Sequence, residues 1–263
     1  MDCFKAMDTE KKRILAIIPA RWASSRFPGK PLAKIRGKEM ILWVAKRVET
    51  SNLFDRVVIA TDSRQIYVVA KAEGYTAIMT SEDCSCGTER CKEVLTILEE
   101  SGEKYDVVVN VQGDEPLISR TQLQQVLLPM REDKTQIATL CKVIEDEQTL
   151  LSPDNVKVVM NHNGEAIYFS RSVVPYNRET TLEYGIAKGY YYKHLGLYAY
   201  RAQVLKEIVD LYPSELEKIE CLEQLRWIEN RYTIKVGITT DDSVGVDSLQ
   251  DLQKVEEILN RQI

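Results

Sequence analysis

The segment ILAIIPARWASSRFPGKPL, residues 14–32, decides the fold class of this 263-residue chain. It joins a short apolar run, ILAII (14–18), to a loop that carries Arg21, Arg26 and Lys30. An apolar run of this length that ends in Pro-Ala is typical of a buried strand in a parallel sheet. Ligands bind beyond the carboxyl ends of such strands, so the basic loop lies where a ligand is expected.

The first half of the chain repeats this pattern of apolar runs and amphipathic stretches. Three more apolar runs predict strands at 57–61, 76–79 and 107–111. Three amphipathic stretches predict helices at 39–51, 63–73 and 88–101. The alternation is typical of strands joined by crossover helices. We therefore expect an α/β fold with a mostly parallel, doubly wound, Rossmann-like sheet.

The second half is richer in predicted strands. Apolar, β-branched runs predict strands at 137–144, 156–160, 166–170, 195–200 and 234–238, and helices are expected at 215–230 and 248–261. The turn residues NHNG (161–164) predict a hairpin or a return strand. We expect an N-terminal tail at 1–13 and a single domain at 14–263, with an inserted, smaller β-rich lobe at about 150–200.

The composition excludes several classes of protein. With 44% hydrophobic and 29% charged residues, the chain is typical of a soluble globular protein. Its net charge of −5 disfavours a nucleic-acid partner, because such proteins carry a basic surface. Residues 1–13 lack a signal-peptide core and no run approaches the roughly 18 apolar residues of a membrane span. We expect a cytoplasmic protein with no membrane partner.

The cysteines do not form a recognisable metal motif. Cys84, Cys86 and Cys91 are close in sequence, but they lack the spacing of paired CxxC knuckles, and the chain has only two histidines. Reduced, unligated thiols are the expected state of a cytosolic chain.

The basic loop after the first strand could bind a phosphate chain. A triphosphate needs several cations and exposed backbone N–H groups, and Arg21, Arg26 and Lys30 provide the charge. It is not a Walker A loop, because Pro31 follows the lysine. The alternative is a solvated surface loop. Placement at a strand end favours phosphate binding.

Two aspartates are candidate ligands of Mg²⁺, which is typically held by one or two carboxylates together with substrate phosphates. Asp114 lies in QGDEP (112–116), directly after the fourth predicted strand. An ordinary turn is the alternative there. Asp247 lies in SVGVDSLQDL (243–252) at the start of a predicted helix, where a capping role is the simpler local interpretation.

Three other residues are candidate contacts for a polar substrate. Glu223 interrupts an apolar ridge on the predicted helix 215–230, where it could accept hydrogen bonds from sugar hydroxyls or pair with an arginine. Arg171 follows the strand at 166–170, and its fork of donors suits a carboxylate ligand. His194 lies among tyrosines, where a buried, satisfied histidine is the commoner outcome.

In combination these segments resemble the 3-deoxy-manno-octulosonate cytidylyltransferases, or CMP-KDO synthetases. The similarity spans about residues 14 to 257. It is carried in order by IPARWASSRFPGKPL, VVIATD, CGTER, VVNVQGDEP, VKVV, YFSRSVVPY, HLGLYAYR, LEQLR and VGVDSLQDL. The combination of GKPL, NVQGDEP and LEQLR is specific to that family.

The resemblance implies a reaction and a set of roles. The anomeric hydroxyl of the octulosonate (KDO) attacks the α-phosphate of CTP, giving CMP-KDO and pyrophosphate for lipopolysaccharide or capsule synthesis. The implied catalytic residues are Arg21, Lys30, Asp114 and Asp247, with the two aspartates holding Mg²⁺. Implied nucleotide contacts are Ala20, Arg21, Arg26, Lys30, Gly87, Thr88, Arg90 and Gln112. Implied acceptor contacts are Gln112, Arg171, His194, Tyr198 and Glu223. A homodimer is also implied.

The chain departs from the family in two places. Cys84 and Cys86 stand where many members have a histidine and a serine, and residues 178–194 are difficult to align. The alternatives are a cytidylyltransferase for a related acidic or amino sugar, such as 8-amino-KDO or a sialic acid, and a non-catalytic nucleotide-binding module. Retention of Asp114 and Asp247 disfavours the module, and the lack of GxGxxG disfavours a dehydrogenase.

Overall fold

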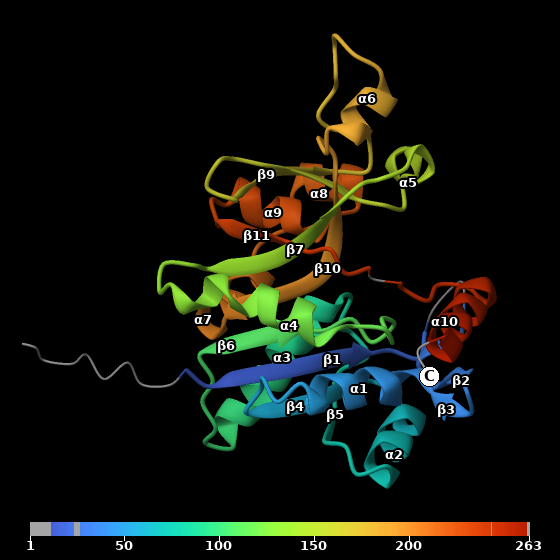
Figure 1. The fold of residues 1–263 in the computed structure, drawn as a ribbon. Coiled ribbons are helices and arrows are strands. Elements are labelled where there is room, and N and C mark those ends of the chain that lie inside the picture. Colours follow the sequence, from blue (N-terminus) through green and yellow to red (C-terminus); the bar gives the residue numbers. More distant parts are fainter. Residues whose placement is uncertain (1–11, 24–26, 243, 262–263) are drawn as a thin grey trace, which may run out of the picture.

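The computed structural model describes residues 12–23, 27–242 and 244–261, and its core is a sheet with helices on both faces (Figure 1). The strand order is β11-β7-β10-β6-β1-β4-β5. These strands are β1 (Ile14–Ala20), β4 (Arg56–Thr61), β5 (Ala77–Met79), β6 (Val107–Asn110), β7 (Ile137–Val143), β10 (Tyr192–Arg201) and β11 (Ile234–Ile238). Six of them share one direction, and β10 runs antiparallel to both of its neighbours. The predicted α/β fold with a mostly parallel sheet is confirmed.

Alternate residues of β1 show why helices cover both faces. Leu15 and Ile17 pack in one core cluster with α3 (Gly87–Glu100), α7 (Ala202–Val209) and α9 (Glu223–Glu229). Ala16 and Ile18 pack in the other cluster, which also contains α1 (Met40–Thr50), α2 (Arg64–Ala72) and α4 (Arg120–Leu127). Successive side chains of a strand point to opposite faces, so an apolar strand is buried only where both faces are covered.

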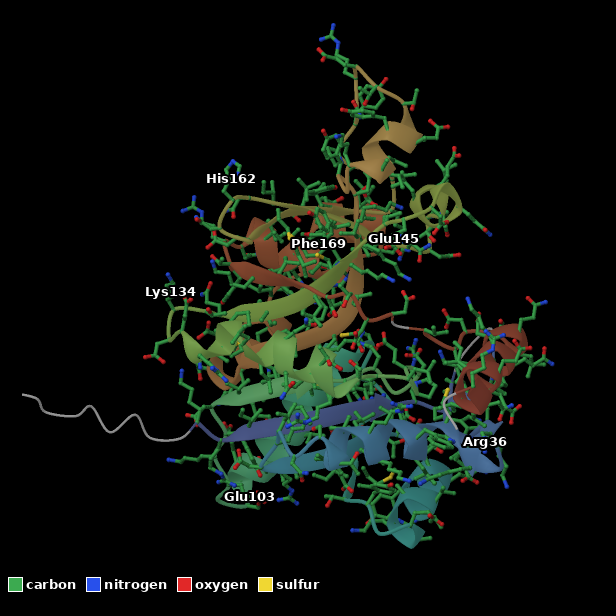
Figure 2. All side chains as sticks on the ribbon, viewed as in Figure 1. Arg36, Glu103, Lys134, Glu145, His162 and Phe169 are labelled. Atoms are coloured by element: carbon green, nitrogen blue, oxygen red, sulfur yellow. The ribbon has the colours of Figure 1, made fainter. Side chains whose placement is uncertain are left out.

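Smaller elements surround this sheet. A hairpin of β8 (Lys157–Met160) and β9 (Ala166–Ser170) branches from β10, and its turn at 161–165 confirms the predicted hairpin. His162 at that turn projects outward (Figure 2). Two short helices, α5 (Glu147–Leu151) and α6 (Leu182–Ala187), lie beyond the sheet (Figure 1). The domain and lobe boundaries stay a prediction.

The C-terminal helix returns to the first half of the chain. The predicted helix at 248–261 is confirmed as α10 (Leu249–Arg261). It packs beside the small hairpin of β2 (Lys34–Ile35) and β3 (Lys38–Glu39), an element that the sequence did not predict (Figure 1). Of the helices in the described ranges, none is long and apolar enough to cross a membrane.

The prediction of one helix at 215–230 is wrong. The structure has α8 (Glu215–Glu220) and α9 (Glu223–Glu229), separated by Cys221 in the left-handed conformation with φ of 52°. The apolar ridge inferred for a continuous helix had Ile219 and Trp227 four residues before and after Glu223. Ile219 is 76% exposed, so this ridge does not exist. Glu223 is the first residue of the second helix.

Arg171 gives a physical reason for this break. Its Nε donates to the carbonyl of Glu220 at 2.7 Å and its Nη2 to that of Cys221 at 3.4 Å. A continuous helix would use both carbonyls for internal hydrogen bonds four residues onward. A contact from a distant strand end therefore replaces the local helical pattern.

A buried lysine holds the branch point of the hairpin, and its removal should destabilise the protein. Lys157 has no exposed surface, and its Nζ donates to the carbonyls of Ser152 at 3.0 Å, Asn155 at 2.7 Å and Arg171. Lys157→Met would leave three partly buried carbonyl acceptors without this donor. We expect the free energy of unfolding to fall by about 2–4 kcal/mol in chemical denaturation.

The matched control is Lys134→Met, because Lys134 projects into solvent (Figure 2) and has a side chain that is 79% exposed. That change should cost less than about 0.5 kcal/mol. A loss of stability at position 157 no larger than in this control would contradict the anchoring role.

Candidate active site

A cavity of about 420 Å³ opens at the carboxyl ends of β1 and β6. It brings together residues that are far apart in the sequence. Among the predicted site residues, its lining contains Ala20, Arg21, Lys30, Gly87, Arg90, Gln112, Asp114 and Asp247. Strand ends are the expected ligand position in this class of sheet.

The basic loop reaches the cavity through a tight turn. Gly29 has a φ of +70°, and a Cβ there would lie 3.1 Å from the Trp22 ring. Lys30 follows in a short 3₁₀ turn, Lys30–Leu32. Arg21 is exposed, with Nη1 3.5 Å from the carbonyl oxygen of Ser85. Arg26 lies outside the described residues, so its predicted phosphate contact stays a prediction.

Backbone geometry explains how the two aspartates converge. A Cβ on Gly113 would lie 2.5 Å from the carbonyl oxygen of Pro19, so only glycine lets this loop cross the end of β1 so closely. The next residue, Asp114, accepts a hydrogen bond at its carbonyl from the backbone N–H of Val246 at 2.9 Å. Asp247 is thereby placed beside Asp114.

Lys30 connects the two carboxylates directly. Its Nζ lies 2.6 Å from Oδ2 of Asp114 and 3.0 Å from Oδ1 of Asp247. Burial alone would lower the pKa of Lys30, but the two carboxylates outweigh burial and raise it. The ammonium therefore stays protonated at neutral pH and occupies a position between two anions.

The capping interpretation of Asp247 does not fit. Ser248 accepts a hydrogen bond from the backbone N–H of Asp251 at 3.2 Å, so Ser248 caps α10. The carboxylate of Asp247 is directed to Lys30 instead.

The two aspartates fit a divalent ion that is shared with a ligand. Their side chains are 32% and 51% exposed, so both are open to the cavity. The described parts of the chain contain no cluster of three or more His, Cys, Asp or Glu residues suited to a metal ion. A hard ion here would need further oxygen ligands from phosphates or water, which is the usual manner of Mg²⁺ binding.

The start of α3 forms another part of the cavity wall. A Cβ on Gly87 would lie 3.4 Å from Nδ2 of Asn110, so the helix begins close to the end of β6. Arg90 reaches the cavity but is buried, and its Nη2 donates to Oδ2 of Asp62 at 2.9 Å. The hydroxyl of Thr88 donates to Glu223 at 2.6 Å. The nucleotide contacts of Thr88 and Arg90 stay predictions.

Gln112 joins the cavity to β10. Its Nε2 donates to the carbonyl of Gly196 at 2.8 Å. His194 lies two residues earlier on this strand, with Nε2 3.0 Å from Oγ1 of Thr139 and its ring against Phe169. Burial lowers the pKa of His194 to about 3, so the imidazole is uncharged at neutral pH.

Tyr198 and Glu223 do not line the cavity. The Tyr198 ring is buried and packs edge-on against Trp227 at 5.3 Å between centroids. Burial raises the pKa of Glu223, whereas hydrogen bonds from Thr88 and Cys86 act in the opposite direction. A carboxylate with a raised pKa in such a setting is a common feature of functional sites.

Arg171 is placed differently from its predicted role. Besides the two contacts described above, Nη1 donates to the carbonyl of Pro153 at 3.0 Å, and Arg171 does not line the cavity. Its guanidinium therefore fixes the break before α9 and, with it, the position of Glu223. The predicted contact with an acceptor carboxylate stays a prediction.

Sequence reasoning missed several polar residues of this region. Asn110 ends the apolar run of β6, and its buried Oδ1 has no hydrogen-bond partner among the described residues. Asp62 neutralises Arg90, and Cys86 contacts Glu223. The signal that could have identified Asn110 and Asp62 is a polar residue at the end of an apolar run. Asn110 ends VVVN, and Asp62 directly follows VVIAT.

Comparisons with known proteins agree with this geometry. The model of the cytidylyltransferase family matches residues 15–235. The 3-deoxy-manno-octulosonate cytidylyltransferase of Parabacteroides distasonis is 48% identical over 92% of this chain and 96% of its own length. The enzyme of the same name from Thermodesulfovibrio yellowstonii is 43% identical over 94% and 98%, respectively.

A solved structure gives the same result. CMP:2-keto-3-deoxy-manno-octonic acid synthetase complexed with CTP superposes with a TM-score of 0.86 at 36% identity, covering 96% of this chain and all of the other. The fold, the strand-end cavity and these relatives together establish that the chain is a nucleotidyltransferase and belongs to the 3-deoxy-manno-octulosonate cytidylyltransferase family.

Proposed function

We propose that this protein transfers CMP from CTP to 3-deoxy-D-manno-octulosonate and releases pyrophosphate. The observation that carries the proposal is the convergence of Lys30, Asp114 and Asp247 at the cavity beyond β1. This set of groups suits a triphosphate bound with a divalent ion. Relatives of this chain carry the name of that reaction, and a similar structure was solved with CTP.

The chemistry requires positioning and charge neutralisation. The acceptor hydroxyl forms a bond to the α-phosphorus while the bond to the pyrophosphate oxygen breaks, and the hydroxyl proton is released. Arg21 and Lys30 would neutralise the charge of the triphosphate, and Asp114 and Asp247 would hold Mg²⁺. Bound Mg²⁺ supplies charge neutralisation at the phosphates and lowers the pKa of a coordinated hydroxyl.

Buried polar groups support a hydroxylated acceptor next to this cavity. Oδ1 of Asn110 and Nε1 of Trp227 are buried without a hydrogen-bond partner in the described ranges. The hydroxyl of Tyr198 makes no well-formed hydrogen bond there either, although a weak interaction with Thr139 lowers its pKa against the larger effects of burial and of Glu223, which raise it. Buried polar atoms are normally satisfied. Asn110 approaches Gly87 of the cavity lining, so a hydroxylated ligand in this region could supply its missing partner.

Pyrophosphate release from a panel of substrates tests the proposal. CTP, UTP, ATP and GTP are each combined with the octulosonate, its 8-amino form, a sialic acid or a sugar 1-phosphate. We expect the highest kcat/KM for CTP with the octulosonate. A preference for another acceptor would assign a related sugar, and CTP binding without turnover of any acceptor would support the non-catalytic module.

Replacement of Glu223 should separate the two substrates. Glu223→Ala removes a carboxylate that lies beside the proposed acceptor region and outside the cavity lining. We expect the KM for the acceptor to rise by at least about 10-fold, with the KM for CTP within about 2-fold of its original value. Steady-state kinetics with each substrate varied in turn measures both.

Glu229→Ala is the control, because Glu229 is exposed at the other end of the same helix. It should leave both KM values unchanged. Equal losses for the acceptor and CTP in Glu223→Ala would count against a sugar contact.

Assembly and location are further parts of the proposal. The segment around α6 exposes large aromatic side chains, including Tyr176 at 86%, Tyr184 at 46% and Tyr190 at 48%. Exposed apolar groups of this kind often mark a protein interface, which supports a homodimer. Sedimentation velocity would test it. We place the reaction in the cytoplasm, where CTP is available, and assign its product to lipopolysaccharide or capsule synthesis.

A further inference from the structure

The carboxylate of Glu223 receives two side-chain donors from the start of α3. Oγ1 of Thr88 donates to Oε1 at 2.6 Å, and Sγ of Cys86 donates to Oε2 at 3.4 Å. Among the described residues, each oxygen therefore has one side-chain donor. A carboxylate oxygen can accept more than one hydrogen bond, so both oxygens can still accept from a ligand.

We propose that the thiol of Cys86 is a positioning residue for the acceptor. It holds Oε2 of Glu223 while Thr88 holds Oε1, so that the carboxylate keeps the orientation in which it meets the sugar. This inference rests on the proposed function, since it assigns Glu223 to the acceptor.

The thiol of Cys86 contacts Glu223 and does not cap its own helix. Cys86 occupies the N-cap position of α3, but its side chain forms no capping hydrogen bond within the described structure. Cys86 also lines the cavity proposed for the nucleotide. One side chain therefore connects that cavity with the proposed acceptor carboxylate.

The electrostatics agree with a donor role. Burial and the Glu223 carboxylate raise the pKa of Cys86 to about 12, so the thiol keeps its proton at neutral pH. Burial raises the pKa of Glu223, and the two donors counteract it. Other titratable groups that affect or respond to Glu223 are Cys91 on α3, Tyr198 and Tyr200 on β10, Glu217 on α8 and Arg226 on α9.

Kinetics of two substitutions test the inference. Cys86→Ala should raise the KM for the octulosonate by about 5-fold and leave the KM for CTP within about 2-fold. Cys86→Ser should restore the acceptor KM, because a hydroxyl can donate to the same oxygen. The control Cys221→Ala removes an exposed thiol near the start of α9 that donates to the carbonyl of Lys218, and should change neither KM.

A second measurement does not depend on the identity of the acceptor. The carboxyl carbon of Glu223 can be titrated by NMR in the original protein, Cys86→Ala and Cys86→Ser. Loss of a donor to the charged form should raise the pKa of Glu223 in the alanine variant, and serine should reverse the shift.

The outcomes are distinct. An unchanged acceptor KM together with an unchanged Glu223 titration in Cys86→Ala would overturn the inference, as would a KM for CTP that rises as much as that for the acceptor. If the original protein does not turn over the octulosonate, the proposed function fails. The carboxyl titration then still decides whether Cys86 holds Glu223.

Discussion

Asp114→Asn should slow pyrophosphate release from CTP by at least about 1000-fold while the fold is retained. Asparagine has the same shape, and the hydrogen bond from Val246 goes to the backbone carbonyl, which the substitution keeps. The lost ion pair with Lys30 is partly exposed, so the cost in stability should be below about 1 kcal/mol. What disappears is one of the two negative charges proposed to hold Mg²⁺.

The measurement is a pyrophosphate assay across a range of Mg²⁺ concentrations, with circular dichroism to verify folding. Asp242→Asn is the control, because Asp242 is exposed and pairs with Lys142 outside the cavity. The turnover of Asp242→Asn should stay within about 2-fold of that of the unsubstituted protein. Near-normal turnover of Asp114→Asn would refute the metal role and remove the main support for the mechanism.

The general fold could be predicted because the early strands carry a strong signal. β1, β4 and β6 are buried on both faces, and a strand buried on both faces needs a continuous apolar run. The position of the basic loop and of Asp114 follows from the same reasoning, since both come directly after such strands. These inferences use only short stretches of sequence.

The convergence of Asp114 and Asp247 could not be derived from spacing. It depends on the close crossing of Gly113 over Pro19 and on the hydrogen bond from Val246. Each of these contacts joins segments that are far apart in the sequence. The resemblance to a family suggested the pair, whereas local reasoning favoured a helix cap for Asp247.

Arg171 and the helix at 215–230 show a second limit. The local sequence favours one helix, but Arg171 takes the carbonyls of Glu220 and Cys221 and the helix divides. A tertiary contact of this kind overrides helix propensity, which is worth less than about 1 kcal/mol per residue. The same contact uses the guanidinium of Arg171, which the sequence analysis assigned to a ligand carboxylate.

Lys30→Met should have opposite effects on catalysis and on metal binding. The side chain keeps its length but loses its charge, so we expect pyrophosphate release to fall by about 100-fold or more. In nucleotide-free protein, however, the ammonium lies between Asp114 and Asp247, where it competes with any divalent ion. Removing it should tighten Mn²⁺ binding by about 10-fold, or about 1.4 kcal/mol.

Mn²⁺ binding without CTP can be followed by electron paramagnetic resonance. Because the two carboxylates raise the pKa of Lys30, the ammonium should compete equally across neutral pH. The difference in Mn²⁺ affinity between the unsubstituted protein and Lys30→Met should therefore not vary with pH in that range. Adding Asp114→Asn to Lys30→Met should cancel the gain, since the second carboxylate is then lost. Metal binding that weakens or stays the same in Lys30→Met would mean that the lysine and the ion do not share this position, and that the two aspartates serve the lysine alone.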